Sequence, residues 1–301
     1  MATAQLTPTA MGIHNLLIAT DFSRCSNAAF HYGLQLSKAY NATAYIVFVL
    51  PNDPYLLAGP EAYVAARDAA RRDLEDLERE VQRSYGDLPH DNYHLYLLDG
   101  DIADSLLSFA QQKKIDLIVL GTHGRGALPK ALLGSVAERV FRHSPVPVLT
   151  LGPSVCHGSR SGAPRSIVVA ADFTPASRRA IRFAANLTQE HKSHLTLVHV
   201  LDPKQLQHMP DRAAVEHGIE TRVRDLLGDK SAGVHCSIRI EAGGVTQKIL
   251  EVAKQQAADL LVLGVRPSSG VMDRLVIPHA YEIVRESPCP VLTLRETRTP
   301  N

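Results

Sequence analysis

The sequence lacks several features that would mark a specialised class of protein. It has no tryptophan and only four cysteines among its 301 residues, and no two of these cysteines form a Cys-x-x-Cys pair. Nothing therefore predicts a disulfide framework or a paired-cysteine metal site. No apolar run reaches the roughly 20 residues that cross a membrane, and residues 1–11 do not resemble a secretory signal. We expect reduced thiols and a cytoplasmic location.

Strong charge and known catalytic motifs are also missing. The net charge is +1, which gives no general attraction to nucleic acid or to a membrane surface. No Gly-x-Ser-x-Gly or His-Glu-x-x-His motif occurs. The pairs His191/His194 and His90/His94 have a spacing that metal ligands can have, but a zinc site is not the favoured interpretation of either. We predict no catalytic residue and no metal ligand, and we expect Cys25 to be a small packed side chain.

The length of the chain and an internal repeat predict two domains. With 45% hydrophobic and 21% charged residues, the composition is ordinary for a globular protein. The repeated segments are 18–23 (IATDFS) with 169–174 (VAADFT), 116–121 (DLIVLG) with 259–264 (DLLVLG), and 145–151 (PVPVLTL) with 288–294 (PCPVLTL). The offset is 151 residues at the first pair and 143 at the second, so the second copy is shorter somewhere between them.

Apolar runs and helical periods alternate along each copy. In the first copy we expect strands at 15–20, 44–50, 93–98, 117–120 and 146–151, and helices at 26–40, 61–85, 102–113 and from about 135 to 143. Alternating units of this kind predict an α/β fold with a parallel sheet that is covered by helices on both faces. We divide the chain into a domain at 1–152, a Gly/Ser/Pro-rich linker at 153–164 and a domain at 165–301.

A glycine-rich stretch at 121–135 follows one of these strands and leads into a helix. It begins GTHGRG at 121–126 and ends Gly134-Ser135. Backbone N–H groups at such a place, together with the positive end of the helix dipole, favour an anion. The alternative is a plain surface turn with Ser135 as the helix N-cap. The spacing is neither that of a P-loop nor that of a dinucleotide-binding fingerprint.

The spacing Gly-x₂-Gly-x₉-Gly-Ser resembles the nucleotide-binding pattern of the universal stress protein family, and the resemblance extends over both copies. It implies Rossmann-like (adenine nucleotide alpha-hydrolase-like) domains and a site for ATP with Mg²⁺. The positions that the resemblance assigns to this site are Ala19, Thr20, Asp21, Val49, Leu120, Gly121, Gly124, Gly134, Ser135 and Val136. For Asp21, the alternative is that it caps the helix that starts near Ser23 to Ser26. His123 and Arg125 either add charge near the phosphates or point into water.

The second copy departs from this pattern. Gly264 is retained, but Pro267 stands where the next glycine is required, and Ile277-Pro278 replace Gly-Ser. Proline removes a backbone donor. We therefore predict one nucleotide site per chain, in the first copy, and a helix-capping role for Asp172.

These features together predict an ATP-binding stress-response sensor or regulator. A slow ATP hydrolase or nucleotidyl transferase, and a structural assembly protein without a ligand, remain alternatives. The resemblance also implies that strands 146–151 and 291–294 pair within one chain. A homodimer and an unidentified protein partner are left open, and neither nucleic acid nor a membrane is expected as a partner. A lid at 51–60 is less favoured than a plain connection, and we interpret residues 66–83 as a solvated amphipathic helix, with Ala70, Leu74, Leu77 and Val81 on its buried stripe.

Overall fold

The computed structural model describes residues 12–51, 59–86, 88–122, 134–155, 163–201, 212–228, 235–265 and 278–295. In the first half, the strands are β1 (Asn15–Ala19), β2 (Thr43–Leu50), β3 (Tyr93–Asp99), β4 (Leu117–Gly121) and β5 (Val148–Leu151). The helices are α1 (Arg24–Tyr40), α2 (Pro60–Ser84), α3 (Ile102–Gln112) and α4 (Ser135–His143), and a 3₁₀ turn spans His90–Asn92. The predicted order of strands and helices is therefore confirmed for this half.

The second half repeats this order. Its strands are β6 (Ser166–Ala170), β7 (His194–Leu201), β8 (His235–Ala242), β9 (Leu260–Val265) and β10 (Val291–Arg295). Its helices are α5 (Pro175–His191), α7 (Arg212–Leu227), α8 (Val245–Gln255) and α9 (Pro278–Glu286). Equivalent residues are 151 positions apart in β1 and β6 and in β2 and β7. They are 143 positions apart in β3 and β8. The missing residues therefore lie in the region of α7, which has 16 residues where α2 has 25.

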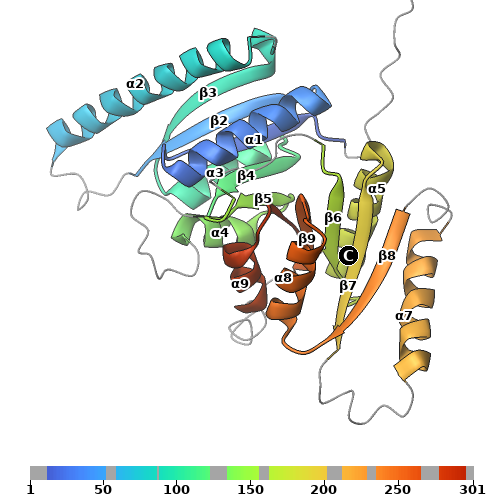
Figure 1. Cartoon of the computed structure of the whole chain (residues 1–301). Helices are drawn as coiled ribbons and strands as arrows, with labels where there is room; N and C mark the ends of the chain where they lie inside the picture. The colour runs from blue at the N-terminus through green and yellow to red at the C-terminus, as the bar shows by residue number, and fades with distance from the viewer. Residues whose placement is uncertain are drawn as a thin grey trace, which may run out of the picture.

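All the described strands form one sheet, in the order β3-β2-β1-β4-β5-β10-β9-β6-β7-β8 (Figure 1). Within each half the neighbouring strands are parallel. The two halves meet where β5 and β10 pair antiparallel, with Leu149 opposite Leu292. Thr150 donates from its hydroxyl to the Val291 carbonyl, and Thr293 donates to the Val148 carbonyl. The predicted pairing of these strands within one chain is confirmed, although β5 begins at Val148 and not at 146.

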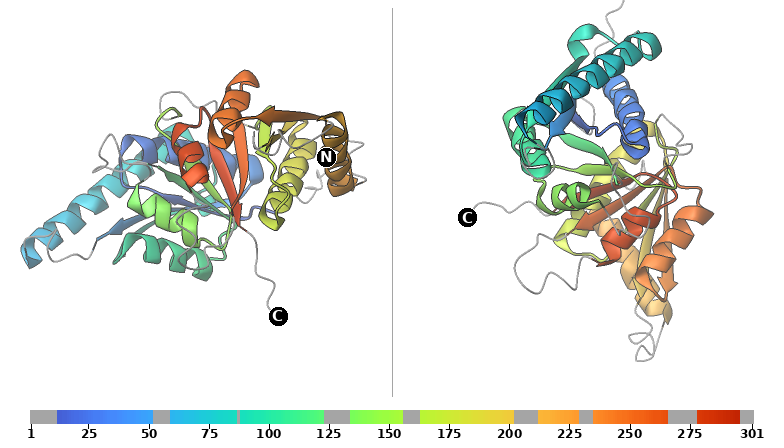
Figure 2. Two further views of the ribbon diagram at one scale, coloured as in Figure 1. Left: turned by 90° about the horizontal axis from the view of Figure 1, so that it is seen from below. Right: turned by 90° about the vertical axis from the view of Figure 1, so that its left-hand side faces the viewer.

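The sheet is buried on both faces because its central strands are apolar without interruption. In β1, Leu16, Leu17 and Ile18 are fully buried, and they alternate between two core clusters, one on each face. One cluster lies under α1, α2, α5 and α7, and the other under α3, α4, α8 and α9. Figure 2 shows these helices on opposite sides of the continuous sheet. Each half thus has the doubly wound arrangement that the sequence predicts.

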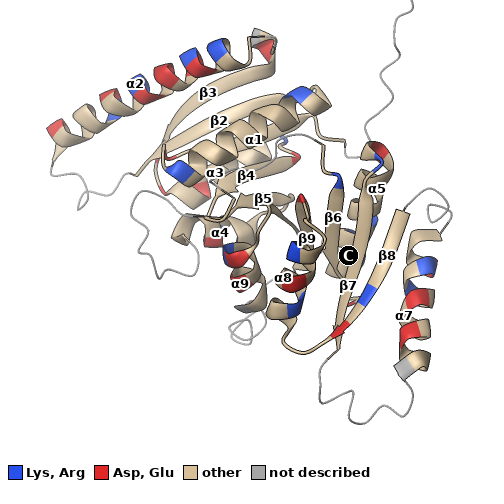
Figure 3. Cartoon of the chain, in the orientation of Figure 1, with Lys and Arg blue, Asp and Glu red and all other residues tan. Residues whose placement is uncertain are grey.

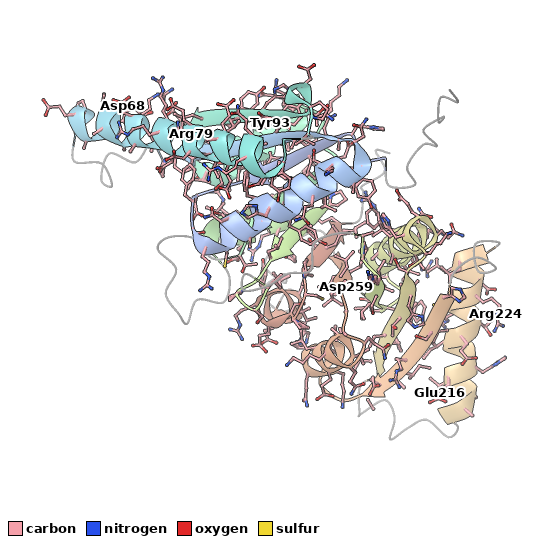
Figure 4. The ribbon with its side chains drawn as sticks, turned by 45° about the horizontal axis from the view of Figure 1, so that its top comes forward. Asp68, Arg79, Tyr93, Glu216, Arg224 and Asp259 are labelled. Atoms are coloured by element: carbon pink, nitrogen blue, oxygen red, sulfur yellow. The ribbon has the colours of Figure 1, made fainter. Side chains whose placement is uncertain are left out.

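The charged faces of the outer helices agree with a solvated amphipathic interpretation. The predicted stripe Ala70, Leu74, Leu77 and Val81 is the buried face of α2. Acidic and basic side chains alternate along the rest of this helix (Figure 3), and Asp68 and Arg79 extend away from the sheet (Figure 4). On α7, Arg224 is exposed and Glu216 is half-buried (both are labelled in Figure 4).

One aspartate in each half joins two strands at the amino-terminal edge of the sheet. The Asp116 carboxylate accepts hydrogen bonds from the His14 and Asn15 amides, at 2.8 and 2.9 Å. Asp259, labelled in Figure 4, accepts from the Arg165 and Ser166 amides, at 2.9 and 3.1 Å. The repeated Asp-Leu-x-Val-Leu-Gly segment therefore begins with a structural residue, because an amide at a strand start otherwise lacks a partner.

A second contact between the halves lies where the carboxyl ends of α1 and α5 meet. The hydroxyl of Tyr40, which is 7% exposed, hydrogen-bonds to Nε2 of His191, and the two rings meet edge to face. Burial lowers the pKa of His191 below its ordinary value, and the neighbouring Glu190 carboxylate opposes this effect. The lowered pKa therefore favours the neutral imidazole of His191 at neutral pH.

This lowered pKa makes the stability of the protein depend on pH. An unfolded histidine has a pKa near 6.5, so below about pH 6.5 the unfolded chain binds more protons than the folded one. We expect the contribution of His191 to be complete above this pH and to be lost as the pH falls through the folded pKa. The free energy of unfolding, measured with urea, should fall between pH 7.5 and pH 5.5 in both proteins. We expect this fall to be smaller in His191→Gln than in the wild type. Equal losses in both proteins would contradict this assignment.

Candidate functional site

The candidate site lies at the carboxyl edge of the first half, where the neighbouring strands β1 and β4 end. The chain turns sharply after β1. Thr20 is 6% exposed, and its hydroxyl accepts a hydrogen bond from the Phe22 amide at 3.1 Å. Oδ1 of Asp21 accepts from the Ser23 amide at 3.0 Å, and the Asp21 amide donates to Oγ of Ser26 at 3.3 Å. These bonds hold the turn from which α1 begins.

The second half builds the same turn. Oδ1 of Asp172 accepts from the Thr174 amide at 3.0 Å, and the Asp172 amide donates to Oγ of Ser177 at 3.1 Å. Phe22 and Phe173 both have a φ of 59°, a left-handed conformation that is costly for a bulky residue. Because the turn persists in the half without the glycine pattern, the Asp-Phe-Ser/Thr repeat has a structural cause that does not require a ligand.

The helix caps differ from those predicted. The N-cap of α1 is Ser23, which accepts from the Ser26 amide, and the N-cap of α5 is Thr174, which accepts from the Ser177 amide. The prediction that Asp172 caps its helix is therefore wrong: this aspartate holds the preceding turn, because its carboxylate reaches the N–H two residues further on. The alternative in which Asp21 caps α1 is also wrong, because Asp21 holds the turn before this helix and Ser23 is the N-cap.

Gly121 and Gly264 allow a strand and a helix to approach closely. A Cβ atom on Gly121 would lie 2.7 Å from the carbonyl carbon of Cys25 and 2.8 Å from the Ser26 amide nitrogen. On Gly264 it would lie 2.3 Å from the Ser177 amide nitrogen and 2.4 Å from the carbonyl carbon of Ala176. In both halves, only glycine lets the end of the strand pack against the first turn of the helix.

Helix α4 begins beside this edge with its first turn uncapped by a side chain. Its N-cap is Gly134, and Ser135 is its exposed first residue, so the alternative with Ser135 as N-cap is wrong. The Gly134 amide donates to the carbonyl of the buried Thr122 at 2.8 Å. This bond joins the two ends of segment 123–133. Gly124, His123 and Arg125 lie within that segment, outside the described residues.

The apolar positions predicted for the site share one face of the sheet. Val49 and Leu120 are 4% and 3% exposed and belong to the core cluster under α3 and α4. Ala19 and Val136 are partly buried and pack against the same cluster. The structure thus brings these four residues to one side of the sheet.

Sequence reasoning missed the polar side chains that hold this edge together. They include Thr122, which also donates from its hydroxyl to the Leu151 carbonyl, and Arg139, which joins α4 to α3. The Arg139 guanidinium donates to Asp101 at 2.7 Å and to Asp104 at 2.8 Å. A hydrogen bond from the Asp104 amide, with Arg139 nearby, holds the pKa of Asp101 below its ordinary value. Asp101 follows Gly100 at the start of a helical period, which is the signal for an N-cap.

The described residues contain no group of three or more His, Cys, Asp or Glu side chains that could hold a metal ion. His191 bonds to Tyr40 whereas His194 bonds to Ser237, so the two histidines have separate partners. Among the described residues, Cys25, Cys236 and Cys289 are not joined in disulfide bonds. Burial raises the pKa of Cys236 to about 11 and that of Cys289 to about 12, which keeps both thiols protonated at neutral pH.

The fold and this edge define a class: α/β proteins in which two doubly wound, Rossmann-like halves share one sheet. The family model described as the universal stress protein family matches residues 12–151 and again residues 164–295. The chain therefore belongs to the universal stress protein family, as a member with two such domains in tandem.

The chain resembles a relative that matches only part of it and relatives that match nearly all of it. Universal stress protein MJ0531 of Methanocaldococcus jannaschii is 30% identical over 137 residues, which cover 45% of this chain and 80% of the relative. A universal stress protein of Mycolicibacterium smegmatis is 24% identical over 300 residues, covering 94% of this chain and 97% of the relative. The crystal structure of a universal stress protein from Archaeoglobus fulgidus covers 94% of this chain and 96% of its own, with 22% identity and a TM-score of 0.73.

In the part of the chain that the structure describes, none of the helices is long and apolar enough to cross a bilayer.

Proposed function

We propose that the first half binds ATP at the carboxyl edge of β1 and β4, and that the protein acts as a nucleotide-dependent regulator in the stress response. The observation that carries the proposal is the start of α4. Its first turn has no side-chain cap, Ser135 is exposed, and Gly134 is bonded back to the end of β4. The amides of Ser135 and Val136 have no partner within the helix, and such amides bind phosphate oxygens well.

In this proposal the phosphates lie at the start of α4, between Gly121 and Ser135, with the Gly124 region around them. The Ser135 hydroxyl adds one further donor to a phosphate oxygen. The base lies towards Ala19, Thr20, Asp21 and Val49, and Leu120 and Val136 form the apolar floor between the two ends. ATP has negatively charged phosphates and an aromatic base. In the proposal, the chain provides hydrogen-bond donors for the phosphates and an apolar surface for the base.

The described residues fit the nucleotide better than they fit a dedicated metal site. Because they hold no cluster of metal-binding side chains, Mg²⁺ enters the proposal as the companion of the phosphates and not as a resident ion. The described cysteines, none of which is in a disulfide bond, agree with the proposed location in a reducing compartment such as the cytoplasm.

We assign no second nucleotide site to the other half. The counterpart of Ser135 is Pro278, the first residue of α9, which has no amide hydrogen to donate. The counterpart of Arg139 is Glu282, so a positive side chain near the helix start is replaced by a negative one. In our proposal, residues 1–152 form the binding domain, 153–164 the linker and 165–301 a structural domain.

Isothermal titration of ATP with Mg²⁺ into the full chain tests the proposal. We expect one site per chain, and we expect that AMP and adenosine bind more weakly, because the phosphate donors dominate. Inorganic triphosphate, which lacks the adenosine, serves as the control that measures how much the base and ribose contribute to binding. Absence of heat and of any ATP-dependent shift in the melting temperature would overturn the nucleotide proposal and favour a purely structural protein.

A further inference from the structure

Helix α4 is held in place by the second half of the chain as well as by the first. Figures 1 and 2 show α4 and α9 next to each other, and both helices cover the same face of the sheet, in which β5 and β10 form the seam between the halves. Tyr281 of α9 extends across this seam. Its ring lies 5.2 Å from the ring of Phe141, which is 2% exposed. Tyr281 thus contacts α4 through both its aromatic ring and its hydroxyl group.

Arg142 connects Tyr281 to the first turn of α4. Its Nε donates to the Tyr281 hydroxyl at 3.1 Å, and its guanidinium lies 5.9 Å from the centre of the Tyr281 ring. Another nitrogen of the same guanidinium donates to Glu138 at 2.8 Å. The Glu138 amide closes the first turn of the helix on the Gly134 carbonyl, also at 2.8 Å. A continuous set of polar contacts therefore runs from the second half to the residue that caps α4.

The backbone next to this seam leaves little room for α4 to move independently. Strand β5, which follows α4, pairs with β10, which follows α9. Gly152, just after β5, packs so closely on the end of α9 that a Cβ there would lie 3.0 Å from the Val284 carbonyl oxygen. Because α4 has only nine residues, a shift at its carboxyl end also moves the amides at its start.

From these contacts we propose that Tyr281 is a positioning residue for the phosphate-binding end of α4, so that the degenerate second half completes the nucleotide site of the first. This inference rests on the proposed function for its nucleotide part. It gives the second half a defined role although that half has lost the glycine pattern. Tyr281 does not touch the nucleotide; it acts through Arg142 and Phe141.

The test compares two tyrosine-to-phenylalanine variants of the full chain. Tyr281→Phe removes the hydroxyl that Arg142 contacts. Tyr40→Phe removes the hydroxyl of a separate hydrogen bond between the halves, which lies at the far end of α1 from the site. We expect Tyr281→Phe to weaken ATP binding about fivefold, and Tyr281→Leu, which also removes the ring, to weaken it more. Tyr40→Phe should lower the melting temperature without changing ATP affinity.

A second measurement needs no nucleotide. Hydrogen exchange of the Gly134 and Glu138 amides, which close the start of α4, should become faster in Tyr281→Phe and stay unchanged in Tyr40→Phe. Faster exchange in a protein that does not bind ATP would overturn the proposed function and still support positioning of α4 by Tyr281. Unchanged exchange and unchanged ATP affinity in both Tyr281 variants would overturn the inference.

Discussion

Replacing Gly264 by alanine is expected to destabilise the protein by about 3 kcal/mol or more, because the new methyl group meets backbone atoms that cannot move aside. The Cβ atom would lie 2.3 Å from the Ser177 amide nitrogen and 2.5 Å from the Ala176 carbonyl oxygen. Ala176 and Ser177 are 0% and 2% exposed, and Thr174 holds this turn of α5 in place. We expect a fall in melting temperature of roughly 5–10 °C in calorimetry.

Gly218→Ala is the matched control in the same half. Gly218 lies within α7, and a Cβ atom there would have nothing within 4 Å. Alanine is a better helix former than glycine, so this variant should gain about 0.5–1 kcal/mol. If Gly264→Ala unfolds at the same temperature as the wild type, close packing does not explain why glycine stands there, and a remnant of a phosphate loop becomes the better account.

The second large effect is expected from Ser135→Pro, which should reduce ATP affinity about 100-fold while α4 stays folded. The substitution copies Pro278 of the second half and removes both the Ser135 amide hydrogen and its hydroxyl. Hydrogen bonds to charged groups contribute about 1.5–3 kcal/mol each, so the loss of two accounts for an effect of this size. Isothermal titration measures the change in affinity.

The local backbone suits this substitution. Ser135 is the first residue of α4, where proline is favoured, and Gly134 has φ −62° and ψ 141°, as the residue before a proline requires. The bond from the Glu138 amide to the Gly134 carbonyl is unaffected. Circular dichroism should therefore show an intact fold. Ser135→Ala keeps the amide and should lose only about tenfold in affinity. A folded Ser135→Pro that binds ATP as tightly as the wild type would place the phosphates elsewhere.

Much of the fold was determined by the sequence alone. The order of strands and helices follows from local hydrophobic periods, and each residue of the predicted α2 stripe is buried. The repeated segments revealed the duplication. The glycine spacing predicted a ligand site at the edge of the sheet beside Ser135. These signals are local or periodic, so they can be recognised without knowing which residues touch.

Only the tertiary structure decided what the repeated residues do. The sequence presents Gly264 as the glycine that the second copy retains from the binding pattern, and Asp172 as a helix cap. The fold shows that Gly264 admits the first turn of α5 and that Asp172 holds a turn that Thr174 caps. The contact of Tyr281 with Arg142 joins residues 139 positions apart. Such contacts depend on how the two halves meet along β5 and β10, and the spacing of residues within either half does not contain that information.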